Sequence, residues 1–404
     1  MQYNIRRWNP LLISLPDIGI GIMWGSLGNV VAFYGYMFTN SASDIAKIYS
    51  VAALVGVVTQ MIVGVLSDKT KHKWGKRSPW IVWGMVLAGI SVICWTFVHS
   101  FIGFLIMSGV TCFLVNVAQC AYYTMVMEVV DPDQVGYSNT MARTTCTLGS
   151  LLVGACAGFL WDKAHPEYTF LIMGILMILS TILVIPYVVK ERPENYIKSE
   201  PFRFSLAFLT EKEVMKLFAV TFLYLASGAA TGQMATSLFV KTYGFSEHVV
   251  GRISMFSSIA SLLFGISAFK LVDMFNRKYI FAFSALGLCL SDLVLLAFLH
   301  TGANPWVLYA WVISWGLFFI AGNVCMYTVL SMVAPKAKLG EYMGLLNLCG
   351  ALPQFIFSNV YGHLIDAGHA NWVLPAAAFW YGLAFVITLS MKLPHPRDLM
   401  KQNQ

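Results

Sequence analysis

Charged residues are scarce in this sequence. Among its 404 residues, 26 are Lys or Arg and 19 are Asp or Glu, so only 11% of the chain is charged, whereas soluble globular proteins carry about 25%. Hydrophobic residues make up 58% of the chain, and its mean hydropathy is +0.70. So little charge excludes a soluble domain of this length and predicts an all-α polytopic membrane protein.

The motifs of common catalytic and metal sites are also missing. The sequence contains no HExxH, no Walker phosphate loop and no glycine-rich nucleotide-binding turn. All eight Cys fall inside apolar runs, where they behave as small hydrophobic residues, so neither a disulfide framework nor a CxxC metal site is indicated. No large polar domain and no clustered nucleophile and base is visible. We therefore expect no enzymatic activity, no cofactor and no metal.

The basic residues follow the pattern of a membrane protein. The net charge is +7, but the basic residues form no continuous stripe, so no nucleic-acid partner is indicated. With both termini cytoplasmic, 22 of the 26 Lys and Arg residues lie on the cytoplasmic side, as the positive-inside rule requires, and the exceptions are Lys47, Lys163, Lys241 and Arg252. No small-residue cleavage site follows a short apolar core, so we expect the N-terminus to be retained. These observations predict a multi-pass protein of the inner or plasma membrane.

Twelve apolar runs are long enough to cross a bilayer as helices, since about twenty residues span a hydrocarbon core of about 30 Å. The predicted spans are 15–38, 45–67, 79–98, 101–127, 138–160, 168–189, 214–237, 248–270, 279–299, 305–332, 341–365 and 372–391. Pro79 and Pro305 stand at helix-start positions, where the missing N–H is not needed.

One long connection divides these runs into two sets of six. We predict an N-terminal six-helix bundle over 1–190, a cytoplasmic linker over 191–213 and a C-terminal six-helix bundle over 214–404. The linker is either an interfacial helix or a plain connection. A weak sequence similarity between the two halves supports a repeat. The eighth run is followed by Asp273, Asn276, Arg277 and Lys278, and the second run is followed in the same way by Asp68, Gly75, Lys76 and Arg77. Repeated halves are typical of secondary transporters.

The loop after the second run is the most charged stretch of the chain. A carboxylate at Asp68, followed by a turn and consecutive basic residues, can bind basic groups and a helix end in one conformation and lose them in another. We predict a cytoplasmic latch here, although such a loop can also act only as a topology determinant. The predicted latch residues are Gly64, Asp68, Lys69, Gly75, Lys76, Arg77 and Pro79.

Gly64, Asp68, Gly75, Lys76 and Arg77 resemble the signature loop of the major facilitator superfamily. The longer pattern D-K-T-x-x-x-W-G-K-R-x-P-W resembles its glycoside–pentoside–hexuronide symporter and sucrose/maltose permease branch. Two further stretches are similar to that branch, namely G-x-x-M-G-x-x-N with P-Q over 340–354, and N-x-x-Q with Glu128 and D-P-D-Q over 116–134.

The resemblance implies a fold of two six-helix pseudo-repeats and proton (cation) symport of a small solute, with a sugar or glycoside as the expected substrate. The chain departs from the branch where Tyr123 replaces an expected Arg, Glu128 an expected Asp and Val135 an expected Arg. A lost Arg removes a bidentate donor suited to hydroxyls and carboxylates. The alternative is therefore a porter for a non-sugar solute, such as an organic acid, peptide or drug. We expect a monomer.

Ionisable residues inside the spans are candidates for proton coupling, because a charge at mid-helix costs about 2.5–3.5 kcal/mol. Glu128 and Arg143 lie on one helical hairpin, as a coupling pair or as a structural ion pair. Asp292 lies deep in the ninth span, but the resemblance places that span outside the central cavity, so packing between helices is the alternative. Asp17 and Arg252 stand near span ends, where we expect them to reach interfacial water.

Uncharged polar residues on single helical faces are candidates for lining a substrate cavity. Amide groups carry both donors and acceptors and suit hydroxyl-rich ligands, and Trp24 or Trp315 can stack on a sugar face. Hydrogen bonding between helices is the alternative role. The predicted cavity residues are Trp24, Ser26, Asn29, Asn116, Gln119, Tyr123, Asn323, Tyr327, Asn347 and Gln354.

Overall fold

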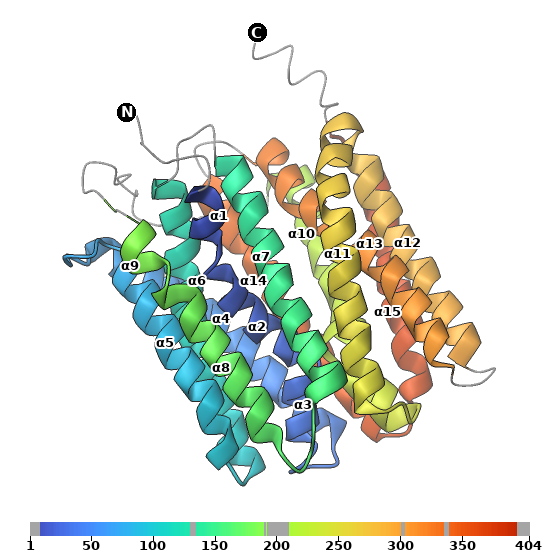
Figure 1. Cartoon of the computed structure of the whole chain (residues 1–404). Coiled ribbons are helices and arrows are strands. Elements are labelled where there is room, and N and C mark those ends of the chain that lie inside the picture. Colours follow the sequence, from blue (N-terminus) through green and yellow to red (C-terminus); the bar gives the residue numbers. More distant parts are fainter. Residues whose placement is uncertain are drawn as a thin grey trace. The chain divides into compact units, whose positions relative to one another are not determined.

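The computed structural model of the chain describes residues 9–129, 135–189, 191, 210–299, 304–334 and 339–393, and all regular elements within these ranges are helices (Figure 1). This confirms the predicted all-helical class. Most of the predicted linker 191–213 and the motif residues Asp131, Pro132, Asp133 and Gln134 lie outside the described residues.

The chain folds as two compact units. Unit 1 comprises 1–40, 47–200 and 250–255, and unit 2 comprises 41–46, 201–249 and 256–404. The first two residues of the second predicted span therefore belong to unit 2, and a short part of the eighth belongs to unit 1.

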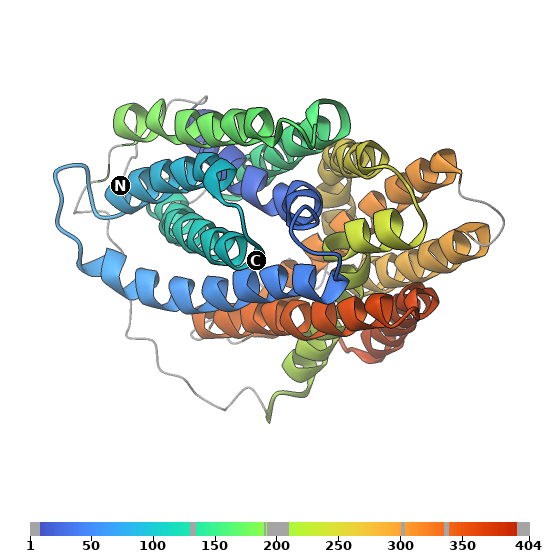
Figure 2. The same cartoon turned by 90° about the horizontal axis from the view of Figure 1, so that it is seen from below.

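The part of the chain that holds the first six predicted spans contains helices of the following bounds. These are α1 (Asn9–Ser14), α2 (Asp17–Leu27), α3 (Val30–Gly35), α4 (Ala42–Lys69), α5 (Ser78–Cys94) with the short helix η1 (Trp95–Phe97), α6 (Phe101–Val129), α7 (Val135–Ala155) with the π-turn η2 (Cys156–Leu160), α8 (Pro166–Ile182) and α9 (Ile185–Val188). Figure 2 shows α5, α6 and α8 running side by side within unit 1.

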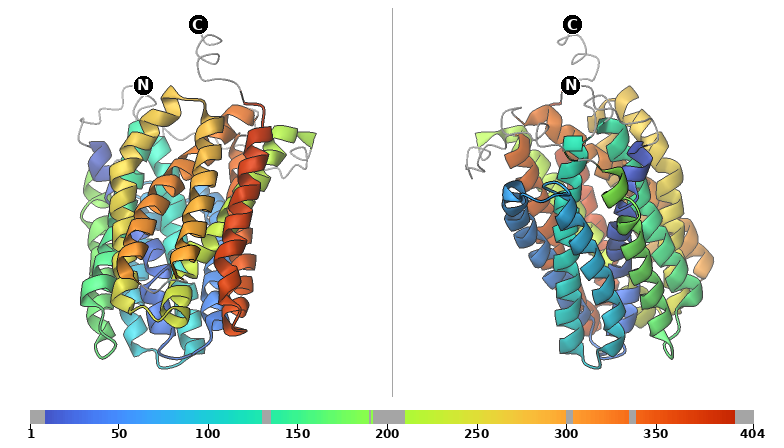
Figure 3. Two further views of the ribbon diagram at one scale, coloured as in Figure 1. Left: turned by 90° about the vertical axis from the view of Figure 1, so that its right-hand side faces the viewer. Right: turned by 60° about the vertical axis from the view of Figure 1, so that its left-hand side comes forward.

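The remaining six predicted spans also coincide with helices. These are α10 (Lys212–Gly228) with the π-turns η5 (Ala229–Gln233) and η6 (Ser237–Thr242), α11 (Glu247–Met274), α12 (Arg277–Leu299), α13 (Pro305–Val333), α14 (Leu339–Asp366), and η8 (Ala370–Trp372) with α15 (Val373–Ser390). Within unit 2, α12 packs against both α13 and α15 (Figure 3). Pro79 and Pro305 lie in the first turns of α5 and α13, as predicted.

Nine helices in the described part of the chain are long and apolar enough to cross a membrane. The three predicted spans that are not among these nine are the first, the eighth, which is α11, and the eleventh, which is α14. The first is not the continuous helix we predicted, because Asn29 leaves the helical region with φ −141° and its side chain accepts a hydrogen bond from the Val30 N–H. That side chain ends one helix and caps the next, which divides the span into α2 and α3.

Glycines let α2 and α7 approach closely inside unit 1. A Cβ on Gly21 would lie 1.9 Å from the Cys146 carbonyl oxygen, and a Cβ on Gly149 would lie 2.2 Å from that of Ile18. Neither position tolerates a side chain without moving a backbone. These glycines thus fix α2 closely against α7.

Unit 2 is organised around Tyr224 of α10, which is fully buried. Its ring lies 5.2 Å from that of Tyr381 and 5.8 Å from that of Phe319, measured between centroids. Its hydroxyl donates to the Phe318 carbonyl at 3.3 Å. Gly322 makes room for this hydroxyl, because a Cβ there would lie 2.3 Å from it.

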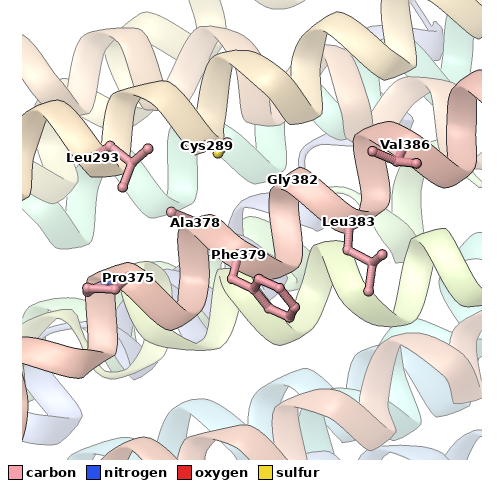
Figure 4. A pocket seen from close by; sticks show the side chains of 8 residues that line it. All are labelled: Cys289, Leu293, Pro375, Ala378, Phe379, Gly382, Leu383 and Val386. Atoms are coloured by element: carbon pink, nitrogen blue, oxygen red, sulfur yellow. The ribbon is translucent and has the colours of Figure 1, made fainter.

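A groove with a volume of about 480 Å³ lies between α12 and α15 on the surface of unit 2 (Figure 4). We call it the α12–α15 groove. The side chains that line it are apolar or small, and they are Cys289, Leu293, Pro375, Ala378, Phe379, Gly382, Leu383 and Val386.

Candidate functional site

A carboxylate, a phenol and a guanidinium form a chain of contacts inside unit 1. Tyr123 of α6 donates its hydroxyl proton to Asp17 Oδ1 of α2 at 3.2 Å. Arg143 of α7 donates from Nη1 to the Tyr123 oxygen at 3.3 Å, and its guanidinium lies 4.9 Å from the centroid of the Tyr123 ring. Asp17 is 0% exposed, whereas Arg143 is exposed. We call these three residues the Asp17 triad.

The burial of Asp17 corrects our expectation that this residue reaches interfacial water. Asp17 begins α2, and a carboxylate in the first turn is favoured by the unpaired N–H groups of the helix start. The close α2–α7 packing brings that helix start against the helix that carries Arg143. The sequence shows only an acid near the start of an apolar run, and the tertiary packing makes it a fully buried carboxylate.

The hairpin pair that we predicted, Glu128 with Arg143, stays a prediction, because the Glu128 side chain lies outside the described residues. What the structure does describe is that Arg143 contacts Tyr123. Arg252, also expected at the interface, is half-buried, and its guanidinium lies 5.1 Å from the Phe159 ring centroid.

A cluster of amide side chains continues along the same face of α6. Trp24 donates from Nε1 to Gln119 Oε1 at 3.0 Å. Gln60 of α4 donates to Asn116 Oδ1 at 3.1 Å, and Asn116 donates to the Cys112 carbonyl at 2.8 Å. Sequence analysis missed Gln60, because it is a lone polar residue in the apolar run of α4.

Ser26 and Asn29 do not join that cluster. Both are 0% exposed. Ser26 donates to the Met23 carbonyl one turn back at 2.7 Å, and Asn29 caps α3. These two predicted cavity residues therefore bond to their own backbone within the helix packing.

A second amide cluster lies in unit 2, where α10 breaks into π-turns. Gln233 of η5 donates from Nε2 to Gln354 Oε1 of α14 at 3.0 Å, and Ser358 donates to Gln233 Oε1 at 2.6 Å. A Cβ on the neighbouring Gly232 would have no atom within 4 Å, so open space adjoins the cluster. Gln354 was predicted from the sequence. Gln233 was not, because a π-turn changes which side chains share a face, and Ser358, one turn after Gln354 on α14, was not predicted either.

The other predicted cavity residues of unit 2 are placed differently. Asn323 is half-buried, Tyr327 and Asn347 are exposed, and none makes a side-chain hydrogen bond within the described part of the chain. Their polar groups are therefore accessible to a ligand. Trp315, considered for stacking on a sugar, stacks on Phe319 with the ring centroids 4.5 Å apart.

The charged loop is held by Glu191, which sequence analysis placed only at the start of the linker. Its carboxylate accepts hydrogen bonds from the backbone N–H groups of Lys76 at 2.7 Å, Arg77 at 2.8 Å and Ser78 at 2.6 Å. The Ser78 hydroxyl donates to the same carboxylate at 2.6 Å. Glu191 thus occupies the positive end of α5, the position in a helix that best binds an anion.

The remaining latch residues surround this contact. Lys76 and Arg77 are buried, and the Arg77 guanidinium donates to the Ser67 hydroxyl. Gly75 has φ +109°, and a Cβ there would lie 2.5 Å from Cβ of Glu191, so the turn requires glycine for both reasons. Lys69 is exposed, and the Asp68 side chain lies outside the described residues.

Asp292 is fully buried between α12 and α13. Its Oδ1 accepts a hydrogen bond from Trp311 Nε1 at 3.2 Å, and its Oδ2 has no hydrogen-bond partner in the described part of the chain. This geometry favours the helix-packing alternative for Asp292. Among the described residues, no group of three His, Cys, Asp or Glu side chains is arranged to hold a metal ion.

Asp366 at the end of α14 forms an anion site within unit 2. It accepts hydrogen bonds from the N–H groups of Ala42 at 2.8 Å and Ser43 at 2.9 Å, from the Ser41 hydroxyl at 2.7 Å and from the Lys241 ammonium. Partial burial by itself would raise the pKa of this carboxyl, but these four donors outweigh it and hold the pKa well below its ordinary value.

Comparison with known proteins agrees with the helical arrangement. The sequence matches the family model of the Major Facilitator Superfamily over residues 18–358 and 217–400. An uncharacterized MFS-type transporter, MJ1560, from Methanocaldococcus jannaschii is 22% identical over 88% of this chain and 91% of its own length. The putative glycoside/cation symporter YagG of Escherichia coli K12 is 26% identical over 36% of this chain and 33% of its own length.

Two solved structures share the fold. A crystal structure of a D-xylose-proton symporter superposes with a TM-score of 0.74 at 18% identity, covering 96% of this chain and 98% of that one. The inward-open xylose transporter XylE from E. coli gives 0.75 at 16% identity, covering 96% of each chain. At these identities the likeness concerns the fold.

Proposed function

The chain belongs to the major facilitator superfamily, and on that premise we propose that it is a secondary active transporter that moves a sugar or glycoside together with a proton by alternating access. The Asp17 triad carries this proposal, because it is a buried carboxylate with a defined donor. The names of the similar proteins, a glycoside/cation symporter and a xylose-proton symporter, support the substrate class.

Asp17 is the proton carrier in this proposal. As a carboxylate it accepts the hydrogen bond from Tyr123, and Tyr123 in turn accepts from Arg143. Protonation of Asp17 removes the charge that this chain of donors stabilises, and so frees the Tyr123 hydroxyl and Arg143 to take another acceptor. One proton moving down a potential of about 100 mV supplies about 2.3 kcal/mol, enough for roughly fifty-fold accumulation of solute. Glu128, on the α6–α7 hairpin that carries Tyr123 and Arg143, remains the alternative proton carrier.

The two amide clusters are the proposed sugar-binding groups. Gln119 and Asn116 in unit 1, and Gln233 with Gln354 in unit 2, present donors and acceptors that match hydroxyl groups. Trp24 brings an aromatic face beside Gln119, a pairing suited to the apolar face of a sugar ring. Each cluster is already hydrogen-bonded internally, so a sugar would exchange these bonds for its own at little net loss.

We further propose that the predicted bundles 1–190 and 214–404 are the moving bodies and that the charged loop is the cytoplasmic latch. Glu191 keeps the loop in register with the start of α5. In this proposal the protein is a monomer of the inner membrane. Both termini are cytoplasmic, as the distribution of Lys and Arg predicts.

One observation favours a different solute. Arg143 is exposed although it contacts Tyr123, so its guanidinium can also bind a carboxylate. An organic acid is therefore the second candidate substrate.

A substrate screen in proteoliposomes tests the proposal. Labelled sugars, glycosides and monocarboxylic acids are offered with and without an inward proton gradient. We expect a sugar or glycoside to accumulate only with the gradient. Accumulation of acids and of no sugar would assign the chain to the second candidate. Protein-free vesicles and the Asp162→Asn variant, which changes an exposed loop carboxylate, serve as controls.

A further inference from the structure

The α12–α15 groove lies on helices that both qualify as membrane spans. Its outward-facing side chains, among them Phe379, Val386 and Leu293, are 62%, 59% and 44% exposed. In a bilayer such residues contact hydrocarbon, because a water-exposed apolar surface of this size would be unfavourable. An acyl chain is therefore the natural content of the groove.

The size of the groove fits one acyl chain. Its volume is about 480 Å³, and it is largely open on its outer side, so a chain lying in it stays in contact with the surrounding lipid. Along α15 the lining runs from Pro375 to Val386, about 16 Å at a rise of 1.5 Å per residue. Gly382 opens the middle of the groove, because a Cβ there would find only Cys289 Sγ, at 3.8 Å.

The two helices run antiparallel past the groove. Figure 4 shows Leu293 near Ala378 and Cys289 near Gly382, so lower residue numbers on α12 lie beside higher numbers on α15. The start of α12 and the end of α15 therefore share one end of the groove. Lys278 is the second residue of α12, and Lys392 follows the last residue of α15 by two.

This end of the groove is basic. Lys392 is exposed, and Lys278 lies 5.9 Å from the ring centroid of exposed Tyr279. Neither ammonium group is in a salt bridge among the described residues, although the charge of Lys392 attracts the Glu213 carboxylate. The nearby carboxylate of Glu213 already binds Lys216 at 3.0 Å and the Lys392 N–H at 2.8 Å. The described residues 366–372, which precede α15 at the opposite end, contain no Lys or Arg.

We propose that the α12–α15 groove holds one acyl chain of an anionic phospholipid whose headgroup is bound by Lys278 and Lys392. Ser390, the last residue of α15, lies four residues beyond Val386, where the lining of the groove ends. This is about 6 Å along the helix. A lipid whose chain fills the groove therefore places its phosphate at the end of α15, near the ammonium groups of Lys278 and Lys392. Lys278, Tyr279 and Lys392 lie at this end of the groove, and Lys and Tyr are residue types typical of a membrane–water interface. The proposal is independent of the transported solute and of the coupling ion.

Photo-crosslinking of the full-length protein in vesicles tests the proposal. The probes are phosphatidylglycerol and phosphatidylcholine with a diazirine in one acyl chain, and the labelled peptides are identified by mass spectrometry. We expect the phosphatidylglycerol probe to label peptides of α12 and α15. Gly382→Phe fills the groove and should lower this labelling at least five-fold, whereas Gly382→Ala should preserve it, because its methyl group makes only an ordinary contact.

The headgroup part is tested separately. Lys278→Gln combined with Lys392→Gln should lower labelling by phosphatidylglycerol about ten-fold and leave labelling by phosphatidylcholine unchanged. Lys71→Gln with Lys73→Gln is the charge-matched control, since both lysines lie in the exposed loop of unit 1. Equal labelling of the wild type by both probes would overturn the headgroup assignment. Labelling that Gly382→Phe does not change, or crosslinks between two copies of the chain through this face, would overturn occupation of the groove by lipid.

Discussion

Tyr123 donates a hydrogen bond to Asp17 at 3.2 Å, from the last two turns of one apolar helix to the start of another. The Asp17 carboxylate is buried, and Tyr123 is also the residue that links it to the exposed Arg143. At the position where the sequence departs from the sugar-permease pattern, the phenol of Tyr123 joins a carboxylate to a guanidinium supplied by another helix.

Removing the Tyr123 hydroxyl should weaken proton coupling. Tyr123→Phe deletes a donor to a buried charged group, an interaction worth about 1.5–3 kcal/mol, so we expect proton-driven accumulation to fall about ten- to hundred-fold. Tyr122→Phe is the matched control, because the buried Tyr122 hydroxyl has no hydrogen-bond partner among the residues that the structure describes. Accumulation of labelled solute in proteoliposomes measures both. Equal losses in the two variants would mean that the Tyr123 hydroxyl has no special role.

Glycine at position 75 should be required for the charged loop. Gly75→Ala puts a Cβ at 2.5 Å from Cβ of Glu191 and forces an L-residue to φ +109°. We expect a destabilisation of about 1–3 kcal/mol, because Glu191 must leave the start of α5. Thermal unfolding in detergent measures the change. Gly244→Ala is the control, since it also forces an L-residue to a positive φ, +71°, but its added Cβ meets no described atom within 4 Å, and a Gly75→Ala protein as stable as this control would contradict the assigned role.

The Asp366 site should make stability depend on pH in the acid range. The pKa of this carboxyl is below its ordinary value in the folded protein, because its four donors outweigh the effect of burial. Because the pKa of Asp366 is lower in the folded protein than its ordinary value of 3.8, the ionised carboxylate stabilises the folded protein fully above pH 3.8. This stabilisation is lost as the pH falls toward the lower pKa of the folded protein.

We therefore expect the unfolding temperature of the wild type in detergent to fall below about pH 4. Asp366→Asn should be less stable at pH 7, by about 1–2 kcal/mol, and should show a shallower decline below pH 4. Asp162→Asn should follow the wild type. An Asp366→Asn protein with the same pH profile as the wild type would show that the site contributes nothing.

The amide pair of unit 2 should affect solute affinity. Gln354→Leu leaves the Gln233 amide without its acceptor and removes a group that can bind a sugar hydroxyl. We expect KM for the transported sugar to rise about ten-fold, as for a lost hydrogen bond of about 1.4 kcal/mol. Asn359→Ala is the control, because Asn359 donates to the Phe355 carbonyl of its own helix. An unchanged KM in Gln354→Leu would remove the pair from the proposed binding groups.

The regular parts of the molecule were predictable from the sequence because they depend on local physics. Apolar runs of membrane length became helices, and Pro79 and Pro305 became helix starts. Several cavity candidates, among them Gln119 and Gln354, are also found in polar clusters, since residues three or four apart share a helical face.

The remaining features could not be predicted, because they depend on contacts between distant segments. Glu191 lies 113 residues from Ser78, whose N–H it binds, and nothing local connects the two. Asp17 is buried only because glycines let α2 approach α7. Gln233 reaches Gln354 through a π-turn, which breaks the periodicity on which the prediction of shared faces relies.

The most direct test of the account measures proton uptake and sugar accumulation together in proteoliposomes that contain a pH-sensitive dye. The wild type, Asp17→Asn and Glu128→Gln are compared, and counterflow exchange without a gradient shows that each variant still binds and moves the sugar. We predict that Asp17→Asn loses proton uptake and accumulation but keeps counterflow. If Asp17→Asn couples normally and Glu128→Gln does not, the proton is carried by Glu128, and the assignment of Asp17 is wrong.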